Sequence, residues 1–584
     1  MTPSPPSAQA LTACSTPPGR GICVRAEVAI SPYTTTNQQR LSSEWRDYLA
    51  LTVLGAGLLG ALISLLLPLQ YPFANDTAGY IQEAHNWLNG NGLLRGTRWY
   101  DTAQDFAPFP LFPPGFSLEI AGLSKLGSSL PHAALAASWL AWLLLLPAIA
   151  FALRPLVGRW AAMAIAVIAV SSPGFVEFGY LALSDSGMVL FSVLSLGILL
   201  RQDCSQGGNA RAIVLSGLLA GCAYLLRNAA AVLPLTVIAF LALSLLSRRL
   251  SLRAVFRGGL LWGTGFALLA FPLFFYNLQT FGSIQPYFSA HGATEFGVLK
   301  AFRVTLWSFL FDISAWRSIA DMAWSAMAIA LLIFPAGLLL LWGGWKRWKQ
   351  ISPSSQSALL LLLLYMSIGF AIIVWGRHRF DWVEVTLVRQ IMPYSWVVLA
   401  VIVWTLYPSK TVGPQFTQIL NGVLVIAGLA LVAGRLNNIW SDLEREAAIQ
   451  AAVSANGYAA AAEQFPGAVL TNHVKLNTSR DRALIDLLKT LPSDTHIVSN
   501  HGPLLSLETG RHIRRFNPTP KTLEELVALR PQLENSALVL AMIPDNKIIR
   551  SAQADTWQGN LLSGLGVRYE TLLRNQNVLV VSLP

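Results

Sequence analysis

The chain has 584 residues, of which 54% are hydrophobic and only 12% are charged. Soluble domains carry about 25% charged residues, so this composition excludes a soluble multidomain enzyme and predicts a polytopic membrane protein. The formal net charge of +11 fits basic residues in cytoplasmic loops, and no motif for binding nucleic acid accompanies it. The four cysteines show neither metal-ligand spacing nor an evident pairing, so we expect free thiols.

The first 45 residues are rich in Pro, Ser, Thr and Gln and lack the apolar core of a signal peptide, so we expect a disordered cytoplasmic tail. A transmembrane domain is predicted over 46–435, because apolar runs of membrane-spanning length follow one another there. These runs predict about eleven helices, over 48–70, 131–152, 158–174, 180–200, 211–226, 230–247, 258–277, 318–342, 356–375, 391–408 and 417–435.

Loop charges predict the orientation of these helices. Basic residues gather in alternate loops, for example Arg248, Arg249 and Arg253, as the positive-inside rule requires for a cytoplasmic N-terminus. Two long loops, over about 71–130 and 278–317, then lie on the outer face, and the odd number of spans places the C-terminus there too. From 436 to 584 helix-like and strand-like segments alternate, which predicts a small outer-face α/β domain. The expected helices are 438–464, 481–491, 502–508 and 523–529, and the expected strands are 495–498, 537–542 and 578–581.

The first long loop opens with the acid Asp76, followed by a segment with apolar residues at helical spacing from Tyr80 to Leu88. This pattern predicts a helix along the membrane surface, with Gln82, Glu83 and Asn86 on its solvated face. We expect Asn89-Gly-Asn-Gly92 to end this helix, because glycines adopt the left-handed conformation freely. Asp76 could cap this helix, or act as a general base or as the anchor of a bound cation at the membrane boundary. A proline-rich segment over 106–116 then leads into an apolar helix, which indicates a loop that re-enters the membrane.

In this order, the motifs resemble the GT-C superfamily of integral-membrane glycosyltransferases, in particular its RgtA-like and protein-mannosyltransferase-like branch. The features that carry the resemblance extend over nearly the whole chain after residue 48: Asp76 with Tyr80, the Pro113-Pro114 pair, Leu183-Ser-Asp185, Leu226-Arg227-Asn228, Tyr276-Asn277 before Phe281-Gly282, Arg389-Gln-Ile-Met-Pro393, and Leu484–Gly510 in the terminal domain. Three positions depart from the family pattern. Thr77 replaces a second acid, Gln390 replaces a tyrosine, and Phe112 replaces the lysine of the aminoarabinose-transferring branch.

The resemblance implies a GT-C fold and transfer of a hexosyl or pentosyl group from a polyprenyl-phosphate donor to a glycan, lipid or protein acceptor of the cell envelope. It places the reaction at the outer face of a bacterial inner membrane. Asp76 would be the catalytic base, and Tyr80 and Asp185 would contact substrate. Arg389 would be the first ligand of the donor phosphate, because a guanidinium can grip phosphate with two hydrogen bonds. No cofactor is certain; a divalent cation is possible, although the missing second acid argues against tight binding at Asp76.

Structural alternatives stand beside these roles. Arg377, with Arg379, and Arg227 are further candidates to bind the donor phosphate. Arg377 and Arg379 could instead anchor a helix at the interface, Arg227 could form a structural ion pair, and Asp185 could be a helix cap. At the level of the whole protein, the alternatives are a transporter or flippase of a lipid-linked glycan and a non-catalytic scaffold. Few ionisable residues within the spans and the lack of an internal repeat disfavour the transporter, and the scaffold leaves the long first loop unexplained.

Overall fold

The structure is a computed structural model, and it describes residues 33–67, 72–94, 108, 112–202, 208–286, 348, 351–379 and 387–406, short pieces between 422 and 465, and residues 481–499, 502–511, 513–515, 536–541, 570–574 and 578–582. The chain forms two compact units, Met1–Asp47 and Tyr48–Pro584. The predicted helix over 523–529 and the predicted span over 318–342 lie outside the described residues. Residues 33–45, predicted as part of the disordered tail, are the beginning of helix α1, Tyr33–Leu66.

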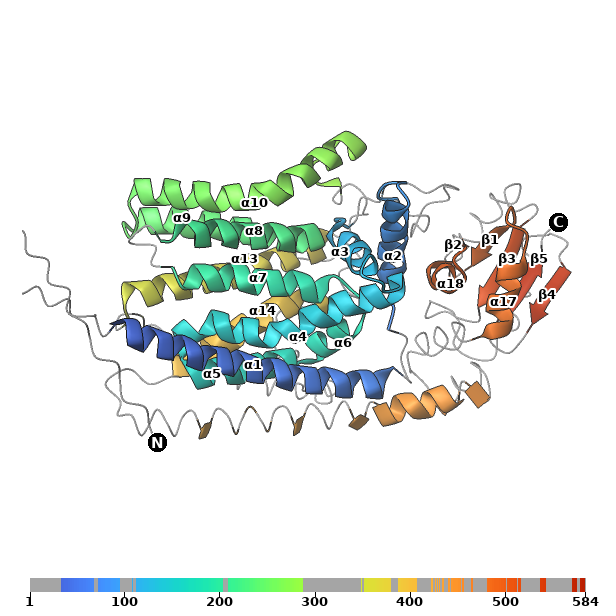
Figure 1. Cartoon of the computed structure of the whole chain (residues 1–584), viewed down its shortest axis with the longest axis horizontal. Coiled ribbons are helices and arrows are strands. Elements are labelled where there is room, and N and C mark those ends of the chain that lie inside the picture. The colour runs from blue at the N-terminus through green and yellow to red at the C-terminus, as the bar shows by residue number, and fades with distance from the viewer. Residues whose placement is uncertain are drawn as a thin grey trace, which may run out of the picture. The chain divides into compact units, whose positions relative to one another are not determined.

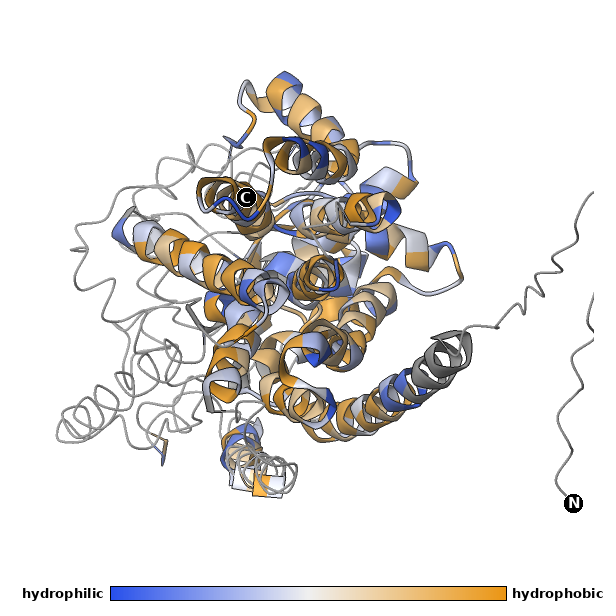
Figure 2. Cartoon of the chain, turned by 90° about the vertical axis from the view of Figure 1, so that its left-hand side faces the viewer, coloured by the Kyte–Doolittle hydropathy of each residue, from blue (hydrophilic) through white to orange (hydrophobic). Residues whose placement is uncertain are grey.

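Apolar helices dominate the described part of the chain, as the composition predicts (Figure 2). Five of them are long and apolar enough to cross a membrane, or six if one bent pair counts as a single span. The five are Glu44–Leu66 within α1, α4 (Leu130–Val157), Asn228–Leu246 with α9 (Val232–Leu246), α10 (Leu252–Phe281) and Pro353–Gly376 within α13 (Pro353–Arg379). The bent pair joins α5 (Arg159–Val170) to α6 (Pro173–Tyr180) with a 69° bend.

Three further apolar helices occupy predicted spans: α7 (Asp185–Leu200), α8 (Ala210–Leu226) and α14 (Leu387–Leu406). Helices α4, α7, α8 and α10 pack side by side in that order (Figure 1). This bundle confirms the polytopic helical fold. The predicted span over 417–435 lies mostly outside the described residues.

Glycines set the close approach of α8 and α10. A Cβ atom at Gly265 of α10 would collide with the backbone carbonyl of Val214, and one at Gly217 of α8 would collide with the carbonyl of Trp262. Small residues let helix backbones approach closely where packing, not the hydrophobic effect, drives association in a membrane. The α8–α10 contact therefore depends on these two glycines.

We expect Gly265→Ala to destabilise the protein by about 1–3 kcal/mol, the usual cost of overpacking a tight contact. At Gly263, on the same helix, an added methyl group would meet nothing within 4 Å, so Gly263→Ala should be neutral or stabilising by up to ~1 kcal/mol. Thermal unfolding of both variants in detergent checks this. Equal melting temperatures for the two would contradict the packing argument.

Helix α2 (Asn75–Leu88) runs across the direction of the bundle helices, beside α3 (Gly115–Ser124) (Figure 1). Its end is as predicted, because Gly90 and Gly92 take left-handed conformations with φ of 78° and 83°. The predicted solvated face is wrong: Glu83 and Asn86 are buried, whereas Trp87 is 49% exposed. Glu83 accepts a hydrogen bond from Ser117 of α3, and Asn86 donates to the carbonyl of Leu94, so α2 is covered on two sides.

The C-terminal region contains the predicted α/β domain. Its five strands are β1 (His496–Ser499), β2 (Ile513–Arg515), β3 (Ser536–Ala541), β4 (Glu570–Arg574) and β5 (Val578–Ser582), in the order β2-β1-β3-β5-β4. Strand β1 is parallel to β2 and β3, whereas β5 is antiparallel to β3 and β4. Helices α17 (Arg482–Thr490) and α18 (Gly502–Thr509) complete the domain, and buried Leu484, Leu488 and Leu505 pack with strand residues in its core.

Candidate active site

Asp76 lies in the first turn of α2 but does not cap it. The N-cap residue is Ala74, and the N-terminal backbone is held by Thr77 instead. The Thr77 hydroxyl accepts a hydrogen bond from the Ala74 N–H at 3.0 Å and donates one to the carbonyl of Ala182 at 2.8 Å. The alternative that Asp76 serves as a helix cap is therefore excluded, and its carboxylate is left for other partners.

Asp185 is the first residue of α7, and Ser184 is the N-cap residue of this helix. Its side chain is 1% exposed, so it is also no ordinary solvated cap. The loop before it is held from α4, where the Ser138 hydroxyl donates to the carbonyls of Leu181 and Leu183 at 2.8 and 3.1 Å. These bonds fix the direction in which α7 begins and therefore where the buried carboxylate lies.

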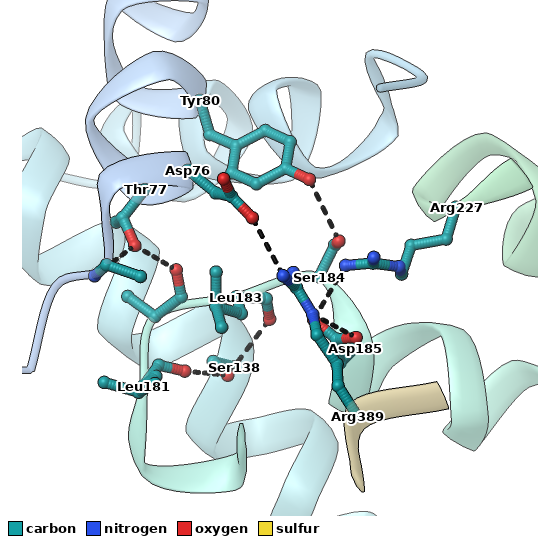
Figure 3. A network of polar contacts seen from close by, with 12 residues as sticks. Asp76, Thr77, Tyr80, Ser138, Leu181, Leu183, Ser184, Asp185, Arg227 and Arg389 are labelled. Atoms are coloured by element: carbon teal, nitrogen blue, oxygen red, sulfur yellow. Dashed lines mark hydrogen bonds and ion pairs between the residues drawn. The ribbon is translucent and has the colours of Figure 1, made fainter. Parts of the chain in front are cut away.

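Arg389 joins the two acids (Figure 3). Its Nη1 donates to Asp76 Oδ2 at 2.9 Å, and its Nε donates to Asp185 Oδ1 and Oδ2 at 2.8 and 2.9 Å. Its Nη2 forms an ion pair with Asp185 Oδ2 at 2.8 Å. The guanidinium side chain is 9% exposed and belongs to the first turn of α14. One arginine thus connects the beginnings of three helices that are far apart in the sequence.

Arg227 completes the cluster. It follows the last residue of α8, where the backbone turns to an extended conformation with φ −154° and ψ 137°. Its Nη1 donates to Asp185 Oδ2 at 2.9 Å, and its guanidinium lies over the ring of Phe112 with 5.9 Å to the centroid. With 16% of its side chain exposed, Arg227 is the more accessible of the two cations.

We call Asp76, Asp185, Arg227 and Arg389 the charge cluster. Two carboxylates and two guanidinium groups give it no net formal charge. Buried charges are tolerated when they are paired and hydrogen-bonded, and removing one partner is costly because the other charge remains buried. The cluster therefore both ties the helix ends together and concentrates functional groups at one place.

Tyr80 is fully buried one helical turn after Asp76. Its hydroxyl is hydrogen-bonded to the Ser184 hydroxyl at 3.2 Å, and its ring meets Phe116 edge-on and Phe112 at a tilt, with centroids 5.1 and 5.5 Å apart. In this arrangement Tyr80 supports the turn that carries Asp185. A direct substrate contact by Tyr80 stays a prediction.

Two further candidates, Arg377 and Arg379, are described in their backbone only. Arg377 is near the end of α13, and its side chain, like that of Arg379, lies outside the described residues. Glu119 of α3 is a further acid whose pKa is raised to about 7 by burial. Nothing in the structure places it in the charge cluster.

A divalent cation does not fit this arrangement of the cluster, because the guanidinium of Arg389 already lies between the carboxylates of Asp76 and Asp185. In the part of the chain that the structure describes, no group of three or more His, Cys, Asp or Glu side chains could hold a metal ion. We therefore derive no step through a metal.

One protein family matches part of the chain. Residues 112–276 match the family described as dolichyl-phosphate-mannose-protein mannosyltransferase. That segment contains Asp185 and Arg227 but neither Asp76 nor Arg389. A comparison with curated proteins found no match.

The fold is similar to that of ArnT from Cupriavidus metallidurans. The ArnT structure bound to undecaprenyl phosphate matches with a TM-score of 0.54 at 13% identity, covering 91% of this chain and 97% of ArnT. The apo structure of the same protein matches with a TM-score of 0.52 at 14% identity and the same coverage. The chain therefore shares the fold of ArnT, in agreement with the fold that the resemblance to GT-C glycosyltransferases implied. The family match supports glycosyl transfer at a membrane.

Proposed function

We propose that this protein is an inverting glycosyltransferase that moves a sugar from a polyprenyl-phosphate donor to an acceptor hydroxyl at the outer face of a bacterial inner membrane. The observation that carries the proposal is the charge cluster, in which Asp76 and Arg389, 313 residues apart, meet through a 2.9 Å bond. The undecaprenyl phosphate bound to ArnT, which shares the fold, supports the donor class.

Asp76 is the proposed general base. Arg389 engages its Oδ2, and Oδ1 has no hydrogen-bond partner among the residues that the structure describes. A carboxylate held in this way can take the proton of an acceptor hydroxyl as the reaction proceeds. The acceptor oxygen then bonds to the anomeric carbon while the bond from that carbon to the phosphate oxygen breaks, and the polyprenyl phosphate leaves with the electron pair. A single displacement inverts the anomeric carbon.

Arg227 is the proposed first contact of the donor phosphate. Arg389 was the leading candidate from the sequence, but its guanidinium is engaged by two carboxylates, whereas Arg227 bonds to one and is more exposed. A guanidinium facing the leaving phosphate stabilises the charge that grows on it. The proposed role of Arg389 is instead to hold the Asp76 carboxylate in place.

The position of the cluster disfavours a transporter. Coupling ions and substrates of secondary transporters bind near the bilayer midplane, at breaks within spans. Here the charged residues lie at helix ends: Asp76 and Asp185 begin α2 and α7, Arg389 is in the first turn of α14, and Arg227 directly follows α8. This arrangement suits a site at the membrane boundary, where a lipid phosphate and a polar acceptor can meet.

Arg227→Gln should lower the retention of polyprenyl phosphate, bare or sugar-loaded, by about tenfold or more, since hydrogen bonds to charged groups contribute about 1.5–3 kcal/mol. Native mass spectrometry of protein extracted gently from its own membrane measures this retention and reads the sugar by mass. Arg211→Gln is the matched control, because Arg211 is an exposed residue at the other end of the same helix. Equal retention in both variants, or bulk phospholipid alone in the wild type, would contradict the donor assignment.

A further inference from the structure

Three exposed arginines, Arg248, Arg253 and Arg257, lie at the turn between α9 and α10. We call them the basic patch. Arg227 of the charge cluster directly precedes the span Asn228–Leu246, whereas the basic patch follows the other end of that span (Figure 1). We propose that the basic patch binds the phosphate headgroup of an anionic phospholipid in the membrane leaflet away from the charge cluster. In the orientation predicted from the loop charges, this is the cytoplasmic leaflet.

Arg248 has a backbone conformation that glycine usually supplies. The Arg248 N–H donates to the carbonyl of Leu245 and the Arg249 N–H donates to that of Ser244, both at 2.9 Å. This is the Schellman pattern, in which the residue after the C-cap, here Ser247, takes the left-handed conformation. Arg248 has a φ of 56° and is the only residue other than glycine with a positive φ in the described part of the chain. A strained arginine where glycine would fit points to a use for its side chain.

Arg249 fastens the turn to α13. Its Nη2 donates to Gln356 Oε1 at 3.0 Å, and its guanidinium lies over the ring of Trp348 with 5.5 Å to the centroid. Gln356 Nε2 in turn donates to the carbonyl of Trp348 at 2.8 Å. These contacts hold the backbone that carries the basic patch, so less ordering is needed when a headgroup binds.

The charges of the basic patch favour an anion. Neither Asp nor Glu occurs in the sequence from 204 to 294. Arg253 and Arg257 are four residues apart and share one face of α10. Arg253 also lies in the first turn of α10, where the helix dipole disfavours a cation. A bound phosphate would offset both the mutual repulsion of the arginines and this unfavourable position.

Apolar side chains beside the basic patch favour a lipid over a soluble anion. Leu252, Phe256 and Leu260 are exposed and four residues apart, so they form the row of α10 next to the arginines. Leu246, at the end of α9, is exposed as well. A phospholipid has acyl chains directly below its phosphate, and this surface has apolar side chains directly beside its arginines. Basic sites at the ends of membrane-spanning helices bind anionic headgroups in this way.

Lipid titration of the full chain in neutral detergent, followed by native mass spectrometry, tests the site. The probes are phosphatidylglycerol, which is anionic, and phosphatidylcholine, which has no net charge. We expect the wild type to bind its first phosphatidylglycerol at least fivefold more tightly than phosphatidylcholine. The patch variant should bind the two lipids within twofold of each other; it carries Arg248→Gln, Arg253→Gln and Arg257→Gln.

A matched control removes the same number of charges from exposed arginines elsewhere, through Arg211→Gln, Arg445→Gln and Arg482→Gln. It should keep the wild-type preference for phosphatidylglycerol. An unchanged preference in the patch variant, or its loss in the control, would overturn the proposal. Release of the lipid by inorganic phosphate at constant ionic strength would also overturn it, because the arginines would then take phosphate from any source. Loss of the preference in Arg227→Gln would place the lipid at the charge cluster instead.

Arg248→Gly separates the role of the side chain from that of the fold. Glycine takes the left-handed conformation without strain, so in neutral detergent this variant should melt at or above the wild-type temperature. Phosphatidylglycerol should raise the melting temperature of the wild type at least twice as much as that of Arg248→Gly, because a ligand of the folded state stabilises it. A lower melting temperature in neutral detergent would contradict the strain at Arg248. Equal lipid-induced shifts would contradict the contact between its side chain and the headgroup.

Discussion

Asp76→Asn is expected to lower turnover by about 10²–10⁴-fold, the usual contribution of a general base. An amide oxygen can still accept the hydrogen bond from Arg389 Nη1, but it cannot take a proton from the acceptor hydroxyl. The loss should therefore appear in the rate of transfer, with the bound lipid retained. Single-turnover transfer of the sugar from donor lipid co-purified with the protein measures the rate.

The stability of Asp76→Asn distinguishes a catalytic from a structural role. Asp76 is 13% exposed and makes one bond to Arg389. The unfolding temperature of the Asp76→Asn variant in detergent should therefore stay close to that of the wild-type protein. Asp494→Asn carries the same substitution at an exposed position of the C-terminal domain and should leave turnover unchanged. Wild-type turnover in Asp76→Asn would show that the base is a different residue.

Asp185→Asn is expected to destabilise the protein by about 3–5 kcal/mol, the typical cost of breaking a buried ion pair from one side. Asp185 is 1% exposed and pairs with both Arg227 and Arg389. Losing its charge leaves these guanidinium groups with only Asp76 to balance them. Chemical or thermal unfolding in detergent, followed by tryptophan fluorescence, measures the effect.

A double-mutant cycle attributes this cost to the ion pair. In the Arg227→Gln background one uncompensated cation is already absent, so Asp185→Asn should cost less there by about 0.5–3 kcal/mol, the usual range for groups in direct contact. Additive effects would mean that the two side chains are not coupled. An Asp185→Asn protein as stable as the wild type would show that the cluster does not hold the helix ends together.

Much of the candidate site could be predicted from the order of motifs, but its geometry could not. Asp76, Asp185, Arg227 and Arg389 stand out as ionisable residues at the ends of apolar runs. Nothing in the sequence assigns Arg389 to both acids, because the bond to Asp76 spans 313 residues and the bonds to Asp185 span 204. Helix packing determines which acid an arginine contacts. The same packing gives Asp76 and Asp185 ion-pair partners, so neither acts as a simple helix cap.

Glu83 shows the limit of periodicity. Helical spacing placed it opposite the apolar residues of α2, and a single-sided helix would leave it in water. Helix α3 covers that face, so Glu83 is buried and bonded to Ser117. The signal that could have identified it was the hydroxyl of Ser117 in the first turn of α3, since a buried hydroxyl usually has a hydrogen-bond partner.

The strands of the C-terminal domain also show where prediction from the sequence pattern ends. Apolar runs predicted β1, β3 and β5, whereas β2 and β4 were not predicted. Strand β2 has the sequence Ile-Arg-Arg and β4 the sequence Glu-Thr-Leu-Leu-Arg, so neither is a clear apolar run. Their pairing with β1 and β5 decides their conformation, because strand formation depends strongly on neighbouring strands.

The central claim is that the charge cluster transfers a sugar from a lipid phosphate. The most direct test is mass spectrometry of the polyprenyl-phosphate pool in membranes that contain either the wild-type protein or Asp76→Asn at equal abundance. The proposed chemistry predicts that the wild type depletes one sugar-loaded species and raises the bare polyprenyl phosphate, while Asp76→Asn leaves the loaded species in place. Identical pools in the two membranes would contradict it.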